Sequence, residues 1–301
     1  MLNGSFSMDL YALFAAITAK GVGALLLAAL VIYGVVAMVR RPKPTAISEP
    51  GSVADQQWRL PFRPLQVVAI VLAIFLLTQF LAGLVLTLVL SATGFSSEKI
   101  DSLLANSAGW QLVYMLLVDG TVVATIYWLL KRRGFSMRAI GLVKPQLADA
   151  GYAIVAYVVY FGALLVVLGL VGQLLPNVNW NQKQELGFDT SATGVGLLPI
   201  FISLVILPPF AEEIMMRGLL YTGLRSTLPL AVAAVLTSLL FGAAHLFNGG
   251  ALLWAAAIDT FMLSLVLVWL RQTRRSLWPC IALHAIKNGM AFIYLFVFKV
   301  V

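Results

Sequence analysis

Charged and sulfhydryl side chains are scarce in this chain of 301 residues. Only 11% of its residues are charged, and its single cysteine, Cys280, excludes an intrachain disulfide and a cysteine-rich metal site. Hydrophobic residues make up 61% of the chain, and the mean hydropathy is +0.97. This composition excludes an ordinary soluble domain and predicts several membrane spans.

Acidic residues are the scarcer of the two signs, with 12 Asp and Glu against 20 Lys and Arg. The basic residues gather in short runs between apolar segments, a pattern typical of topology signals and of contacts with anionic lipids. The net charge of +8 therefore predicts a lipid bilayer as the partner, and no nucleic acid.

Eight apolar stretches approach or exceed the roughly 20 residues that a helix needs to cross the hydrocarbon. They cover residues 17–39, 65–92, 108–130, 151–175, 193–213, 228–247, 250–270 and 277–299. No internal repeat is evident. The sequence predicts an all-α fold, a polytopic transmembrane helical bundle of about eight spans.

The chain divides into two parts at about residue 107. Residues 1–107 contain N-terminal membrane spans and a polar, proline-bearing linker at about 40–64, and residues 108–301 form a helical core with its polar motifs within 208–288. Basic runs follow the odd-numbered spans, and Lys and Arg accumulate in cytoplasmic loops. We therefore expect an integral membrane protein with both termini outside.

Ionisable residues inside the apolar stretches are the informative minority, because each costs roughly 2.5–3.5 kcal/mol on insertion scales and needs a partner or a wet cavity. Most of them fall in the last third of the chain. With one asparagine they are Asp119, Glu212, Glu213, Arg217, His245, Asp259, His284, Lys287 and Asn288.

The stretch PPFAEEIMMRG carries two adjacent glutamates. Glu213 precedes Arg217 by four residues, the favourable order for an ion pair along a helix. Glu212 points about 100° away from Glu213 and has no obvious local counter-charge. Burial would favour its protonated form, so we expect Glu212 to be a general base. The alternative is that both acids only hold helices together.

The only two histidines of the chain occur in the segments FGAAH and HAIKN. In the first, Phe241 and His245 share a helix face, and in the second His284 and Asn288 do. Polar groups on one face of an apolar helix are expected to point away from lipid. Together with the glutamate pair, they indicate a catalytic site.

The segments EEIMMR, FGAAH and HAIKN match, in this order, the motifs EExxxR, FxxxH and HxxxN. In this respect residues 195–299 resemble the CAAX protease and bacteriocin-processing family, also called the Abi or type II CAAX prenyl endopeptidase family. The resemblance implies an intramembrane endopeptidase that hydrolyses a membrane-associated peptide or protein, and a bacterial-type plasma membrane as its location.

The resemblance also implies roles for single residues. Glu212 and His245 resemble the pair that activates water for attack on the peptide carbonyl, and His284 and Asn288 resemble the pair that stabilises the oxyanion. The structural support is expected from Glu213, Arg217 and Phe241.

Two other chemistries stay open at this stage. Glu212, His245 and His284 together have the composition of a catalytic zinc shell, although no HExxH segment is present. We favour glutamate catalysis without a metal or other cofactor. Cys280 shares a helix face with His284 and Asn288, but a thiol one turn from its histidine is poorly placed to attack a substrate, so we expect a buried and inert cysteine.

Two functions of other classes also remain. The chain is alternatively a non-catalytic membrane scaffold or a bacteriocin-immunity protein, as the resemblance allows. An ion-coupled transporter also uses intramembrane acids and histidines, but it is expected to show paired repeats with broken helices.

The depths of the two histidines conflict in this scheme. A straight helix from about residue 228 places His245 some 25 Å across the membrane, whereas His284 would lie about 10 Å in. If the motifs form one site, then span six begins with a stretch that does not cross the membrane, or the predicted span boundaries are wrong, or the helices tilt strongly.

Overall fold

The computed structural model describes residues 23–40, 58, 60–176, 180, 188, 191–248 and 251–299. Within this part of the chain the membrane-length helices are α3 (Pro64–Ala92), α5 (Ala108–Arg132), α6 (Leu147–Leu174), the continuous helix Gly194–Arg225, α11 (Trp254–Arg274) and the helix Trp278–Val297, which starts as α12 (Trp278–Phe292) and ends as η5 (Ile293–Val297). The shorter elements are the helix Gly23–Val39, α4 (Ser97–Asn106), η1 (Met137–Ile140), α10 (Leu230–Ala244) and the antiparallel strands β1 (Phe247–Asn248) and β2 (Ala251–Leu252).

The prediction of a transmembrane helical bundle is confirmed. Six helices are long and apolar enough to cross a membrane, and the spans predicted at 17–39 and 228–247 correspond to the shorter apolar helices Gly23–Val39 and Leu230–Ala244. Most of the linker predicted at about 40–64 and both chain ends lie outside the described residues. The division at residue 107 and the placement of the termini stay predictions.

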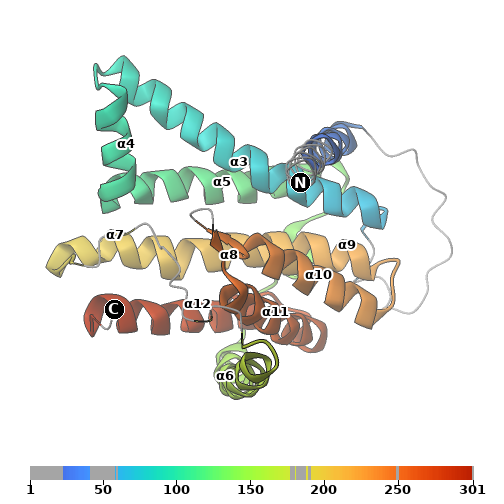
Figure 1. Cartoon of the computed structure of the whole chain (residues 1–301). Coiled ribbons are helices and arrows are strands. Elements are labelled where there is room, and N and C mark those ends of the chain that lie inside the picture. The colour runs from blue at the N-terminus through green and yellow to red at the C-terminus, as the bar shows by residue number, and fades with distance from the viewer. Residues whose placement is uncertain are drawn as a thin grey trace, which may run out of the picture.

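The helix Gly194–Arg225 runs through the centre of the bundle (Figure 1). On one side it packs against α5, and on the other against α12, which in turn packs against α6 and α11. In Figure 1, α6 is seen nearly end-on at the margin of the bundle, consistent with the exposure of much of its apolar surface. The central helix therefore has neighbours from both halves of the sequence.

Two π-helical stretches interrupt this central helix. It consists of η2 (Gly194–Gly196), α7 (Leu197–Phe201), the π-helix η3 (Ile202–Ile206), α8 (Leu207–Glu213), the π-helix η4 (Ile214–Leu220) and α9 (Tyr221–Arg225). Wider turns of this kind are frequent at functional sites because they rotate the following side chains and alter backbone pairing. The two glutamates lie at the junction of α8 and η4.

The levels at which the helices begin resolve the conflict between the two histidines. A Cβ added to Gly218 would lie 3.4 Å from Leu277 Cδ1, so α12 begins level with Gly218, about 10 Å before the end of α9. The 15 residues of α10 start just beyond the end of α9 and rise about 22 Å back along it, of which about the first 10 Å only reach the level of Gly218. His245 therefore lies only about 12 Å deeper than Leu277, and His284, on the second turn of α12, about 10 Å deeper. Our assumption that the helices begin at one level was wrong.

Candidate active site

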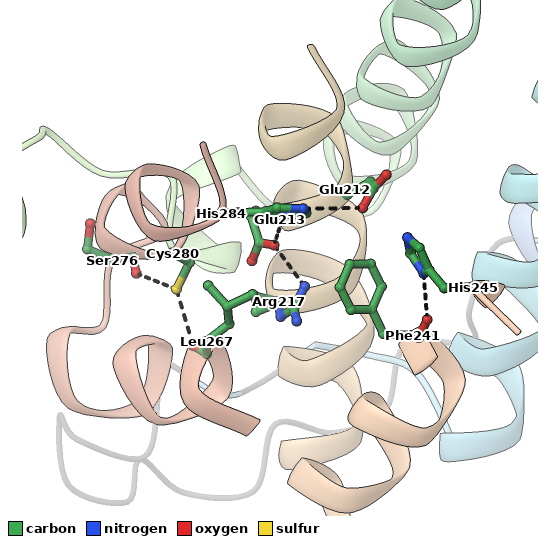
Figure 2. Close-up of polar contacts among 9 residues, drawn as sticks. All are labelled: Glu212, Glu213, Arg217, Phe241, His245, Leu267, Ser276, Cys280 and His284. Atoms are coloured by element: carbon green, nitrogen blue, oxygen red, sulfur yellow. Dashed lines mark hydrogen bonds and ion pairs between the residues drawn. The ribbon is translucent and has the colours of Figure 1, made fainter. Parts of the chain in front are cut away.

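Glu213 is the centre of a buried polar cluster. Its Oε1 accepts a hydrogen bond from Arg217 Nη1 at 2.8 Å and another from His284 Nδ1 at 2.9 Å. Glu213 and Arg217 are both fully buried, and the side chain of His284 is 6% exposed. The pair expected from the spacing is present, and its carboxylate also fixes the ring of His284 on α12 (Figure 2).

Glu212 differs from its neighbour as the sequence suggested. Its side chain is 28% exposed, whereas that of Glu213 is fully buried; the Oε2 of each glutamate has no hydrogen-bond partner among the described residues. Among the described residues, the charged or chargeable nitrogen within 4.0 Å of its carboxylate is His284 Nε2. Glu212 is therefore a carboxylate with access to the site and without a direct ion pair to an arginine or lysine in the described part of the chain.

Both histidines are oriented through Nδ1. A carboxylate and a carbonyl oxygen only accept hydrogen bonds, so each must receive a proton from its histidine. His284 Nδ1–H donates to Glu213, and His245 Nδ1–H donates to the carbonyl oxygen of Phe241 at 2.9 Å. This arrangement leaves the Nε2 atom of each ring for other partners.

The ring of Phe241 lies between Arg217 and His245 (Figure 2). The centroid of its ring is 5.0 Å from that of His245 and 5.9 Å from that of His284, both edge to face. The guanidinium carbon of Arg217 lies 4.4 Å from the same centroid, a cation–π contact. One buried aromatic ring thus connects the helices that carry the two histidines.

Asn288 makes a bond that the sequence did not predict. Its Nδ2 donates to the carbonyl oxygen of Leu204 at 2.9 Å. In α-helical or π-helical pairing this carbonyl would receive the N–H of residue 208 or 209, and both are proline, which has none. Asn288 therefore satisfies an acceptor that Pro208 and Pro209 leave open, and its second amide hydrogen remains for another partner.

Three further polar residues lie on helices of the bundle, Asp119 on α5, Asp259 on α11 and Lys287 on α12. Asp119 on α5 is buried within electrostatic reach of Glu212, and its Oδ2 has no hydrogen-bond partner in the described part of the chain. Asp259, in contrast, bonds to two neighbouring helices, since it accepts from the Tyr160 hydroxyl on α6 and pairs with Lys287 Nζ on α12 at 3.2 Å.

The zinc alternative depends on three ligands meeting at one point. Among the described residues, which include Glu212, His245 and His284, no group of three His, Cys, Asp or Glu side chains is close enough to hold a metal ion. Cys280 is fully buried, with Sγ 3.3 Å from the carbonyl oxygen of Leu267. Its surroundings are those of a packed thiol.

Fold and site together define a class, a helical integral membrane protein with a carboxylate–imidazole cluster inside the bundle. Residues 194–290, about a third of the chain, match the family model of type II CAAX prenyl endopeptidases of the Rce1-like kind. This match confirms the resemblance over those residues and supports, at family level, an intramembrane endopeptidase of the CAAX type. Neither the curated proteins nor the solved structures include a match to this chain.

Proposed function

We propose that this protein is an intramembrane endopeptidase that hydrolyses a peptide bond of a membrane-associated substrate, with Glu212 as the general base. The observation that carries the proposal is the contrast within the glutamate pair. Glu213 is fully buried and accepts from Arg217 and His284 on Oε1, whereas the side chain of Glu212 is 28% exposed and has no ion pair with an arginine or lysine among the described residues. A general base must be within reach of the water from which it takes a proton, and the partial exposure of Glu212 favours it over the fully buried Glu213.

In the proposed reaction, Glu212 and His245 remove a proton from water as its oxygen attacks the substrate carbonyl carbon. His245 suits this role because its Nδ1 donates to Phe241, so Nε2 of the neutral ring has a lone pair to accept a proton. The carbon–nitrogen bond then breaks as the same proton passes to the leaving amine.

The negative charge that develops on the carbonyl oxygen needs hydrogen-bond donors. In the proposal these are the Nε2–H of His284 and the second amide hydrogen of Asn288. His284 then has both ring protons, and the charges of Glu212, Glu213, Arg217 and His284 cancel within the cluster. Such donors, fixed before the reaction by Glu213 and by Leu204, stabilise the transition state without reorganisation.

The test is cleavage of peptides by purified protein in lipid nanodiscs. A peptide with a C-terminal CAAX segment is supplied in a prenylated and an unprenylated form, and the products are identified by mass spectrometry. The proposal expects cleavage by the wild type and by Glu98→Gln, which removes an exposed carboxylate on α4, and none by Glu212→Gln. Equal cleavage by Glu212→Gln would sink the proposal.

The same assay separates the alternatives. Retained cleavage after treatment with a strong zinc chelator supports glutamate catalysis, and loss that added zinc restores supports a metal enzyme. If no peptide is cleaved and partner binding survives Glu212→Gln together with His245→Asn, a scaffold or immunity role replaces the enzyme.

A further inference from the structure

A second polar site lies at the end of α5, where Lys131, Arg132 and Arg133 follow one another. It is a cavity of about 230 Å³ between the helix Gly23–Val39, the start of α3 and the end of α5. Its lining residues are Tyr33, Val36, Ala37, Arg40, Pro61, Gln66 and Arg133. No Asp or Glu is among these lining residues, in the part of the chain that the structure describes.

One wall follows a helix face from the membrane surface inward. Tyr33, Val36, Ala37 and Arg40 recur at the spacing of successive helical turns, so they lie in a row. Arg40 follows the last helical residue, and Tyr33 lies about 10 Å deeper. The cavity is therefore basic at its outer end and apolar toward the bilayer.

The opposite wall supplies hydrogen-bond donors. Arg133 Nη2 donates to the backbone oxygens of Ala37 and Arg40, and its guanidinium carbon lies 4.5 Å from the centroid of the Phe62 ring. Its Nε is buried without a hydrogen-bond partner among the described residues. Gln66 Oε1 accepts a hydrogen bond from the Arg63 N–H at 3.0 Å, so the amide nitrogen of Gln66 remains as a donor.

Arg133 has no ion pair with a carboxylate among the described residues. The salt bridges of the described residues involve Arg217, Arg274, His284 and Lys287, and none of them includes Arg40 or Arg133. Burial and the neighbouring Arg132 lower the pKa of Arg133. Both causes disfavour the cation, and a bound anion would offset them.

We infer that this cavity binds a phosphate-bearing anion, with Arg40 and Arg133 on the phosphate. Two arginines at the membrane surface above an apolar wall match a lipid phosphate with its acyl chain alongside Val36. A free phosphate would use the same arginines but not the apolar wall. The anion would join the helix Gly23–Val39 to α3 and α5.

Native mass spectrometry of the detergent-released protein tests this inference, with phosphatidylglycerol and phosphatidylcholine of identical acyl chains as probes. We expect preferential retention of phosphatidylglycerol, and about fivefold weaker retention in Arg40→Gln and in Arg133→Gln. The matched control is Lys144→Gln, which removes an exposed charge that does not line the cavity.

Arg133 also bonds to helix backbone, so Arg40→Gln is the decisive variant if Arg133→Gln fails to fold. A parallel arm adds millimolar inorganic phosphate. Displacement of phosphatidylglycerol by phosphate supports a soluble phosphate ligand, and unchanged retention supports the lipid. Equal retention of the two lipids by the wild type, or the same loss in Arg40→Gln and Lys144→Gln, overturns the inference.

Discussion

Removal of charge from Glu213 is expected to destabilise the protein more than removal of its partner Arg217. The two substitutions that compare them are Glu213→Gln and Arg217→Met. Glu213 balances two groups, because Arg217 and His284 both donate to its Oε1. Without Arg217, the carboxylate still has His284. Without the carboxylate, the buried guanidinium loses its ion pair and keeps the cation–π contact with the Phe241 ring.

The magnitudes follow from burial. Glu213 and Arg217 are 0% exposed, and breaking a buried pair by removal of one partner typically costs about 3–5 kcal/mol because it leaves an uncompensated charge. That range applies to Glu213→Gln. Arg217→Met loses a charge-assisted hydrogen bond, worth about 1.5–3 kcal/mol, while the remaining carboxylate keeps one donor. The double variant should cost less than the two single variants added together.

The assay is the free energy of unfolding in mixed micelles for the wild type, both single variants and the double variant. The double-variant cycle should give an interaction energy above about 1 kcal/mol. Additive losses, or a larger loss in Arg217→Met than in Glu213→Gln, would contradict the assignment of Glu213 as the shared acceptor.

Three other substitutions give separable outcomes. Asn288→Ala should cost about 1–3 kcal/mol of stability. In a Pro208→Ala background the cost should be much smaller, because residue 208 regains an N–H for the Leu204 carbonyl. If cleavage stays lost in this more stable double variant, Asn288 has a role in the reaction itself. His245→Asn keeps a donor for the Phe241 oxygen but removes Nε2, so unfolding should be nearly unchanged while the cleavage rate falls about 10²–10⁴-fold; a folded variant with wild-type rates refutes this role. Asp119→Leu removes a buried oxygen that has no hydrogen-bond partner among the described residues and should stabilise the protein by about 1 kcal/mol, measured by thermal unfolding, whereas a loss of stability would indicate a partner for Asp119.

Features that depend on local spacing could be predicted from the sequence. The Glu213–Arg217 pair follows from a separation of four residues on one helix, and the apolar stretches are long enough to mark each helix. The contrast between Glu212 and Glu213 follows from the same geometry. These predictions need no knowledge of how the helices pack.

Contacts between distant segments could not be predicted in this way. The bond from His284 to Glu213 joins residues 71 positions apart and depends on how α12 packs against the central helix. Asn288 bonds to a carbonyl that two prolines leave open, which requires that the two helices lie at matching levels. The same missing information, the level at which each helix begins, made the predicted depth of His245 wrong.

The most direct measurement is cleavage of the CAAX peptide in water enriched in ¹⁸O, under single-turnover conditions, by the wild type and by a folded Glu212→Gln variant. Attack by water activated at Glu212 predicts one ¹⁸O atom in the new carboxyl group of the wild-type product, and no product from the variant. Wild-type cleavage rates in Glu212→Gln, or a first-turnover product without ¹⁸O, would contradict hydrolysis by this glutamate acting as a base.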